Sequence, residues 1–150
     1  MKSISKLASV IAGIIVTIIG FIAIIGFITT IIEFSKLGML DLVFKNEDTI
    51  ISIIFTIVFF ACGTGLLNGK SKASAKLFTF ALAIVAIIVE KFVLEGYVYT
   101  FAQFALLYIF EDLSIVSTFA DLYPTLIYVS MISTVVGAVC HILSFGSSRD

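Results

Sequence analysis

Long stretches without a charged residue are the feature that most constrains this chain. The first stretch covers residues 7–32, which is 26 residues. Three further charge-free stretches cover 49–69, 77–89 and 122–148. A helix needs about 20 apolar residues to cross the ~30 Å hydrocarbon core of a bilayer. The first, second and fourth stretches meet this length directly, and the third meets it if Glu90 and Lys91 lie inside the span.

The composition points the same way. Hydrophobic residues make up 61% of the chain and charged residues 13%, against about 45–50% and about 25% in a typical soluble domain. Ten acids and nine bases cannot coat a soluble domain of this size with polar groups. The net charge of −1 gives no basic surface to neutralise phosphates, so nucleic acid is excluded as a partner.

These observations predict an all-α fold, an integral membrane four-helix bundle that forms one transmembrane domain over residues 1–150. We place the spans at about 7–32, 49–68, 76–95 and 122–145. The first apolar stretch is too long for the core of a secretory signal, so we interpret it as a retained span. Asp121 is expected to cap the fourth span, with Pro124 in its first turn.

The basic residues predict the orientation. With four spans, six of them fall on one side: Lys2, Lys6, Lys70, Lys72, Lys76 and Arg149. Only Lys36 and Lys45 fall on the other side, among several acids. Basic residues accumulate on the cytoplasmic side. We therefore expect a multi-pass protein of the cell membrane with both termini in the cytoplasm.

The segment 96–121 is aromatic and separates the last two spans. Tyr97, Phe101, Phe104 and Tyr108 recur at steps of four, three and four, which aligns them on one helical face. Such amphipathic aromatics favour the membrane–water boundary. We expect a short interfacial helix that caps the outer side of the bundle. The alternative, a fifth span over 97–119, would place Glu111 and Asp112 at considerable cost in lipid.

Small residues are spaced so that each span has one face for close helix packing. In lipid, such faces mark the contacts between helices. Gly13, Gly20, Gly65, Ala83 and Gly137 represent these faces, which also include Ser9, Thr17, Ala61, Asn68, Thr79, Ala86, Ser130 and Ser133. The expected product is a compact antiparallel bundle.

Glu90 is the strongest candidate for an intramembrane polar site. It extends the face of Ala83 and Ala86 by four residues, so its carboxyl group should point into the bundle. Ionisable groups at such depth are costly and often functional. At the same level we expect Thr29, Thr30 and Tyr128 as partners. The structural interpretation is a clasp that joins helices, with Lys91 reaching towards the outer surface.

No motif indicates catalysis, and we expect neither an enzyme, nor a cofactor, nor a metal site. Cys62 and Cys140 lie at similar depth in the predicted bundle but form no Cys-x-x-Cys pair, and His141 is the only histidine. Packing explains such cysteines better than redox chemistry or metal binding.

The sequence is consistent with two functions. The favoured one is a non-catalytic membrane protein that acts by binding another membrane component, as an accessory subunit or an immunity-type protein. Its partners would be the lipid bilayer and another membrane protein, or a second copy of itself. The alternative is an oligomeric channel, permease or pore-forming protein that uses Glu90 and the Ser and Thr faces.

Overall fold

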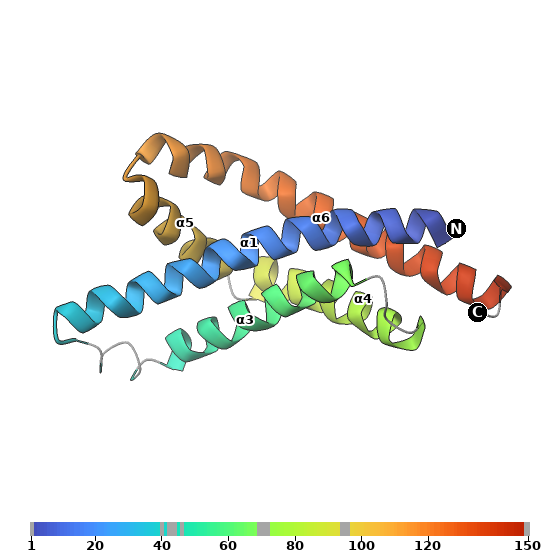
Figure 1. Ribbon diagram of the computed structural model, residues 1–150, viewed down its shortest axis with the longest axis horizontal. Coiled ribbons are helices and arrows are strands. Elements are labelled where there is room, and N and C mark those ends of the chain that lie inside the picture. Colours follow the sequence, from blue (N-terminus) through green and yellow to red (C-terminus); the bar gives the residue numbers. More distant parts are fainter. Residues whose placement is uncertain are drawn as a thin grey trace.

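The computed structural model describes residues 2–39, 41, 45, 47–68, 73–93 and 97–148. Over these residues the chain forms helices and no strands (Figure 1), which confirms the all-α prediction. The elements are α1 (Lys2–Lys36), α3 (Glu47–Leu67), α4 (Ala73–Ile88), the π-helix η1 (Val89–Val93), α5 (Tyr97–Phe110) and α6 (Leu113–Ser148).

Among the described residues, three helices are long and apolar enough to cross a membrane. They contain the segments Ser3–Lys36, Thr49–Leu67 and Leu113–Leu143. The expected count of four single spans is therefore wrong. The predicted third span is divided because α4 ends after 16 residues, at Ile88, and continues directly as the π-helix η1. The alternative fifth span is also not a single helix, since the chain turns at Glu111 and Asp112 between α5 and α6.

Helix α1 lies at the centre of the arrangement. It packs against α3, α5 and α6, whereas α4 packs against α3 and α6. The start of α1 and the end of α6 lie at one end of the molecule (Figure 1). The end of α1 and the turn between α5 and α6 lie at the opposite end. This antiparallel arrangement matches the connectivity expected from the sequence.

Glycines allow α1 and α3 to approach closely. A Cβ atom on Gly13 would lie 2.8 Å from Leu67 Cγ, and one on Gly20 would lie 2.9 Å from Phe60 Cα. On the facing helix, a Cβ atom on Gly63 would lie 2.6 Å from the backbone nitrogen of Thr17. Small residues are thus required on both sides of this contact.

The other small-residue faces are partly as expected. Ala83 and Gly137 are buried, and Gly137 packs against the Phe80 ring. However, Ala61 in α3 and Asn68, which follows the end of α3, are exposed. The glycine that faces α1 is Gly63, whereas Gly65 faces Thr79 of α4. The face of small residues predicted for α3 is therefore not the face that contacts α1.

A regular C-terminal cap ends α1 beyond the predicted boundary. Gly38 has a φ of +70°, which glycine adopts without steric cost. The N–H of Met39 donates to Phe34 O at 2.9 Å, and the N–H of Gly38 donates to Ser35 O at 3.1 Å. These two bonds form a Schellman motif, so the helix continues four residues past the predicted end at Ile32.

The start of α6 was predicted nine residues too late. Asp112, not Asp121, is the N-cap, and its Oδ1 accepts from the N–H of Ser114 at 2.9 Å and from its hydroxyl at 2.7 Å. These bonds hold the pKa of the exposed Asp112 carboxyl below its usual value. Asp121 and Pro124 lie inside the helix, so the missing N–H of Pro124 falls in its interior.

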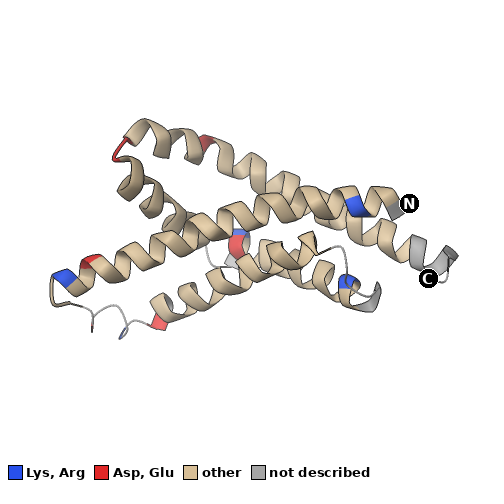
Figure 2. Cartoon of the chain, viewed as in Figure 1, with Lys and Arg blue, Asp and Glu red and all other residues tan. Residues whose placement is uncertain are grey.

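The exterior of the bundle is apolar. Large hydrophobic side chains are exposed on every long helix; on α1 they include Ile4, Leu7, Ile11, Ile14, Ile18, Phe21, Ile28 and Ile32. Soluble monomers rarely expose contiguous apolar surface on this scale. Charged residues of the described chain concentrate towards the two ends, apart from a pair in the middle (Figure 2). That pair is Glu90 and Lys91 in η1.

Candidate functional site

The chain changes from α-helix to π-helix immediately before Glu90. The π-helix η1 places Glu90 at its second position, and α5 starts at Tyr97. Single turns of π-helix within or beside α-helices are rare and often coincide with functional positions. Glu90 is completely buried, which agrees with the expectation that its side chain points inwards.

The Glu90 carboxylate binds the first turn of α5. Oε2 accepts from the N–H of Val98 at 3.2 Å, and Oε1 accepts from the N–H of Tyr99 at 3.4 Å. The first N–H groups of a helix have no partner within it, and the helix dipole favours negative charge there. The Glu90 side chain therefore accepts hydrogen bonds from backbone N–H groups at the start of α5, which have no partner within that helix.

A third donor comes from α6. The hydroxyl of Tyr123 donates to Glu90 Oε1 at 3.3 Å. Each of the three bonds is longer than the 2.9–3.0 Å common for such groups, so each alone contributes modestly. Together they supply the donors that a buried carboxyl group requires. Glu90 thus connects the π-helix to two other elements.

Aromatic rings enclose this junction between α5 and α6. The Tyr99 ring lies 4.5 Å from the Tyr123 ring and stacks on Phe119 at 5.7 Å, measured between centroids. Gln103 Nε2 donates to the hydroxyl of Tyr99 at 2.7 Å. These contacts fix Tyr123 beside Glu90 and exclude water from the carboxylate.

Lys91 and Tyr128 form a separate pair. The Lys91 ammonium lies 3.4 Å from the centroid of the Tyr128 ring, a cation–π contact. Tyr128 was predicted as a partner of Glu90, but the structure places Tyr123, five residues earlier in α6, in that role. The interpretation of Tyr128 as a Glu90 partner is therefore wrong.

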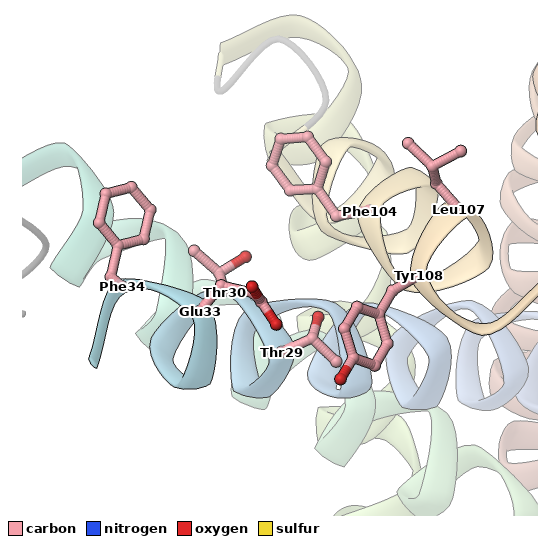
Figure 3. Close-up of a pocket in the computed structure, with 7 residues that line it drawn as sticks. All are labelled: Thr29, Thr30, Glu33, Phe34, Phe104, Leu107 and Tyr108. Atoms are coloured by element: carbon pink, nitrogen blue, oxygen red, sulfur yellow. The ribbon is translucent and has the colours of Figure 1, made fainter. Parts of the chain in front are cut away.

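Thr29 and Thr30 also lie away from Glu90. Both hydroxyl groups donate to Gly26 O within α1, at 2.8 and 2.9 Å. Their side chains instead line a groove between α1 and α5 with a volume of about 450 Å³. Figure 3 shows the groove, whose lining consists of Thr29, Thr30, Glu33, Phe34, Phe104, Leu107 and Tyr108.

The aromatic residues predicted to share one face of α5 do not all lie in the same environment. Phe101 is buried and contacts Phe27 edge to face, with ring centroids 5.9 Å apart. Phe104 and Tyr108 are about half exposed and face the groove. The side chain of Tyr97 lies outside what the structure describes. One side of α5 is therefore inserted into the bundle, because Val98, Ala102 and Ala105 are also buried.

Sequence reasoning missed three residues of this region: Tyr123, Gly26 and Gly63. Gly26 continues a spacing of three from Gly20 and Ala23, which was a usable signal in α1. Gly63 lies two residues before Gly65 and therefore on another face of the helix, so the predicted face of α3 did not include it. The bonds of Glu90 to Val98 and Tyr99 left no sequence pattern, since their donors are backbone groups.

No group of three or more His, Cys, Asp or Glu side chains among the described residues could hold a metal ion. Cys62 is buried, Cys140 is half buried, and both are free thiols. What the arrangement offers is a buried carboxyl group at Glu90 that joins η1 to α5 and α6, and a separate open groove between α1 and α5.

Comparisons with protein-family models, with curated proteins and with solved structures found no match to this chain.

Proposed function

We propose that this is a multi-pass protein of the cell membrane that acts without catalysis by binding another membrane component. Such a protein would be an accessory subunit or an immunity-type protein, in a bilayer that covers the apolar exterior of the bundle. Both termini would be cytoplasmic, and the end of α1 and the turn between α5 and α6 would face outwards.

The observation that carries this proposal is the environment of Glu90. Its carboxylate is fully buried and binds three donors of its own chain. A residue that lines a conduction path needs contact with water or with the transported ion. Glu90 is better suited to hold α5 in place. The exposed surface of the molecule is then the part that is available to bind a partner.

Purification in a mild neutral detergent tests the proposal. We expect a second membrane protein to co-purify in stoichiometric amount, and mass spectrometry would identify it. A copy of the same chain as the sole companion, in an assembly without ion permeability, would support self-association. A protein that purifies alone as a monomer from its native membrane would contradict the proposal.

One observation favours the alternative of a channel or permease. A buried acid, Glu90, lies in a π-helical turn that follows α4 and precedes α5, and transporters place irregular helices at their binding sites. If this alternative holds, the purified protein should make liposomes permeable to ions or protons. A folded Glu90→Gln variant should then lose that permeability, whereas a clasp predicts no permeability in either protein.

A further inference from the structure

The groove between α1 and α5 has mainly apolar walls and a few polar groups at its α1 side. Phe34, Phe104 and Leu107 supply apolar surface. Thr29, Thr30 and Glu33 supply oxygen atoms, and all three lie on the last turns of α1 (Figure 3). A volume of about 450 Å³ lies in the range of specific binding pockets, which is about 300–1,000 Å³.

The polar groups of α1 in this groove present acceptors. The hydroxyl protons of Thr29 and Thr30 are both committed to Gly26 O, so these oxygens have only lone pairs to offer. Glu33 adds a half-exposed carboxylate. Its Oε1 lies 3.6 Å from Lys36 Nζ, and the Lys36 side chain is itself 65% exposed. An exposed pair of this kind is weak, so an incoming cation can compete for the carboxylate.

The surrounding end of the molecule is acidic. The segments 33–48 and 111–121 together contain seven acids and two bases. Glu33 lies near the end of α1, Glu47 begins α3 and Asp112 caps α6. The end of α1, the start of α3 and the turn between α5 and α6 lie at the same end of the bundle (Figure 1). A long-range negative field of this kind attracts a partner that carries several positive charges.

We propose that the groove binds a cationic amphipathic helix, with one Lys or Arg at Glu33 and an adjacent apolar side chain between Phe104 and Leu107. The inference rests on the proposed function and specifies its partner. A helix that lies in an apolar groove is a common mode of recognition. The rings of Phe104 and Tyr108 add cation–π attraction for the same charged group.

The absence of tryptophan from this protein allows a direct binding assay. The probe is a synthetic amphipathic peptide of leucine, alanine and lysine with a single tryptophan, whose fluorescence reports binding. The full chain is held in neutral maltoside micelles, and empty micelles give the baseline. A counterpart with glutamate in place of lysine is the charge control.

Three variants make the assay specific. Glu33→Gln should raise Kd about tenfold, which corresponds to the loss of one charge-assisted hydrogen bond. Leu107→Lys should raise Kd at least as much, because it places a positive charge in the groove. Glu47→Gln removes an acid at the same end but outside the groove, and it should change Kd by less than about twofold. Unchanged thermal melting would show that the variants fold.

Each other outcome overturns the inference. Equal effects of Glu33→Gln and Glu47→Gln on Kd would mean that the peptide responds only to the overall negative charge at this end of the protein. Equal binding of the lysine and glutamate peptides, or no binding above empty micelles, would exclude a cation-specific groove. If a native partner co-purifies equally with the wild-type protein and Glu33→Gln, the proposed function stands and the groove assignment fails.

Discussion

At the scale of single residues, two positions determine where α5 lies. Gly26 lets the backbone of α5 touch α1, because a Cβ atom there would lie 1.8 Å from Phe101 O. Glu90 fixes the start of the same helix through Val98 and Tyr99. One residue thus permits the approach of α5, and the other orients it.

Replacing Gly26 tests the first of these roles. Gly26→Ala should lower the free energy of unfolding by about 3 kcal/mol or more, at or above the upper end of typical overpacking effects, because the obstacle is backbone. Gly65→Ala is the matched control, since its new methyl group would meet only the Thr79 Cγ2 methyl at 3.0 Å. Unfolding in detergent, followed by circular dichroism, measures both. Similar losses for the two variants would contradict the close contact at Gly26.

Replacing Glu90 tests the second role. Glu90→Leu leaves the buried N–H of Val98 without an acceptor, and an unsatisfied buried donor costs about 1–3 kcal/mol. With Tyr99 and Tyr123 also affected, we expect the unfolding free energy to fall by at least about 2 kcal/mol. Tyr123→Phe removes a single bond and should cost about 0.5–1.5 kcal/mol.

Glu90→Gln should fall between these two variants. Both carboxylate oxygens accept hydrogen bonds, and the glutamine amide replaces one of them with a donor. If Glu90→Leu were as stable as Tyr123→Phe in the same detergent assay, the carboxylate would not be what holds α5.

The inward direction of Glu90 was predictable, but its partners were not. Helical spacing from Ala83 and Ala86 is a local property, and it gave the buried orientation correctly. The partners depend on where the start of α5 lies relative to η1, which the sequence pattern does not encode. Thr29 and Thr30 were expected at the depth of Glu90 in a third span over 76–95, whereas Val98 and Tyr99 of α5 occupy that position.

At the scale of elements, helix ends account for the main differences between prediction and structure. The apolar pattern located α1 and α3 to within a few residues. It missed the early start of α6 because Asp121 and Pro124 resemble a helix N-terminus. Asp112 with Ser114 provides the actual cap. The exposed position of Asp121 on α6 lets the helix continue past this acid.

The turn between α5 and α6 offers a test at this scale. Glu111 has a φ of 51°, the left-handed region that costs a non-glycine residue about 1–2 kcal/mol. Glu111→Gly should raise the unfolding free energy by about 0.5–1 kcal/mol. Glu111→Ala keeps the strain and removes the charge, so it is the control. An equal gain from both variants would assign the effect to the charge.

At the scale of the whole molecule, the proposed orientation in the membrane, with both termini cytoplasmic, can be tested by labelling. Ser71→Cys and Ser35→Cys are placed singly in a chain that lacks Cys62 and Cys140. A membrane-impermeant thiol reagent should label Ser35→Cys in intact cells and Ser71→Cys only after the cells are opened. Ser35 is exposed near the end of α1. The reverse labelling pattern would invert the proposed orientation.

The two longest helices have a consequence for the membrane that hosts this protein. α1 has 35 residues and α6 has 36, so they are about 52 and 54 Å long at 1.5 Å per residue. A hydrocarbon layer of ~30 Å accommodates only part of such lengths unless the helices tilt. Lipids with longer acyl chains reduce this mismatch, and cellular membranes differ in thickness by a few ångströms. The thickness of the bilayer should therefore influence the tilt of the bundle relative to the bilayer normal. It should also influence how far the acidic end projects into the surrounding water.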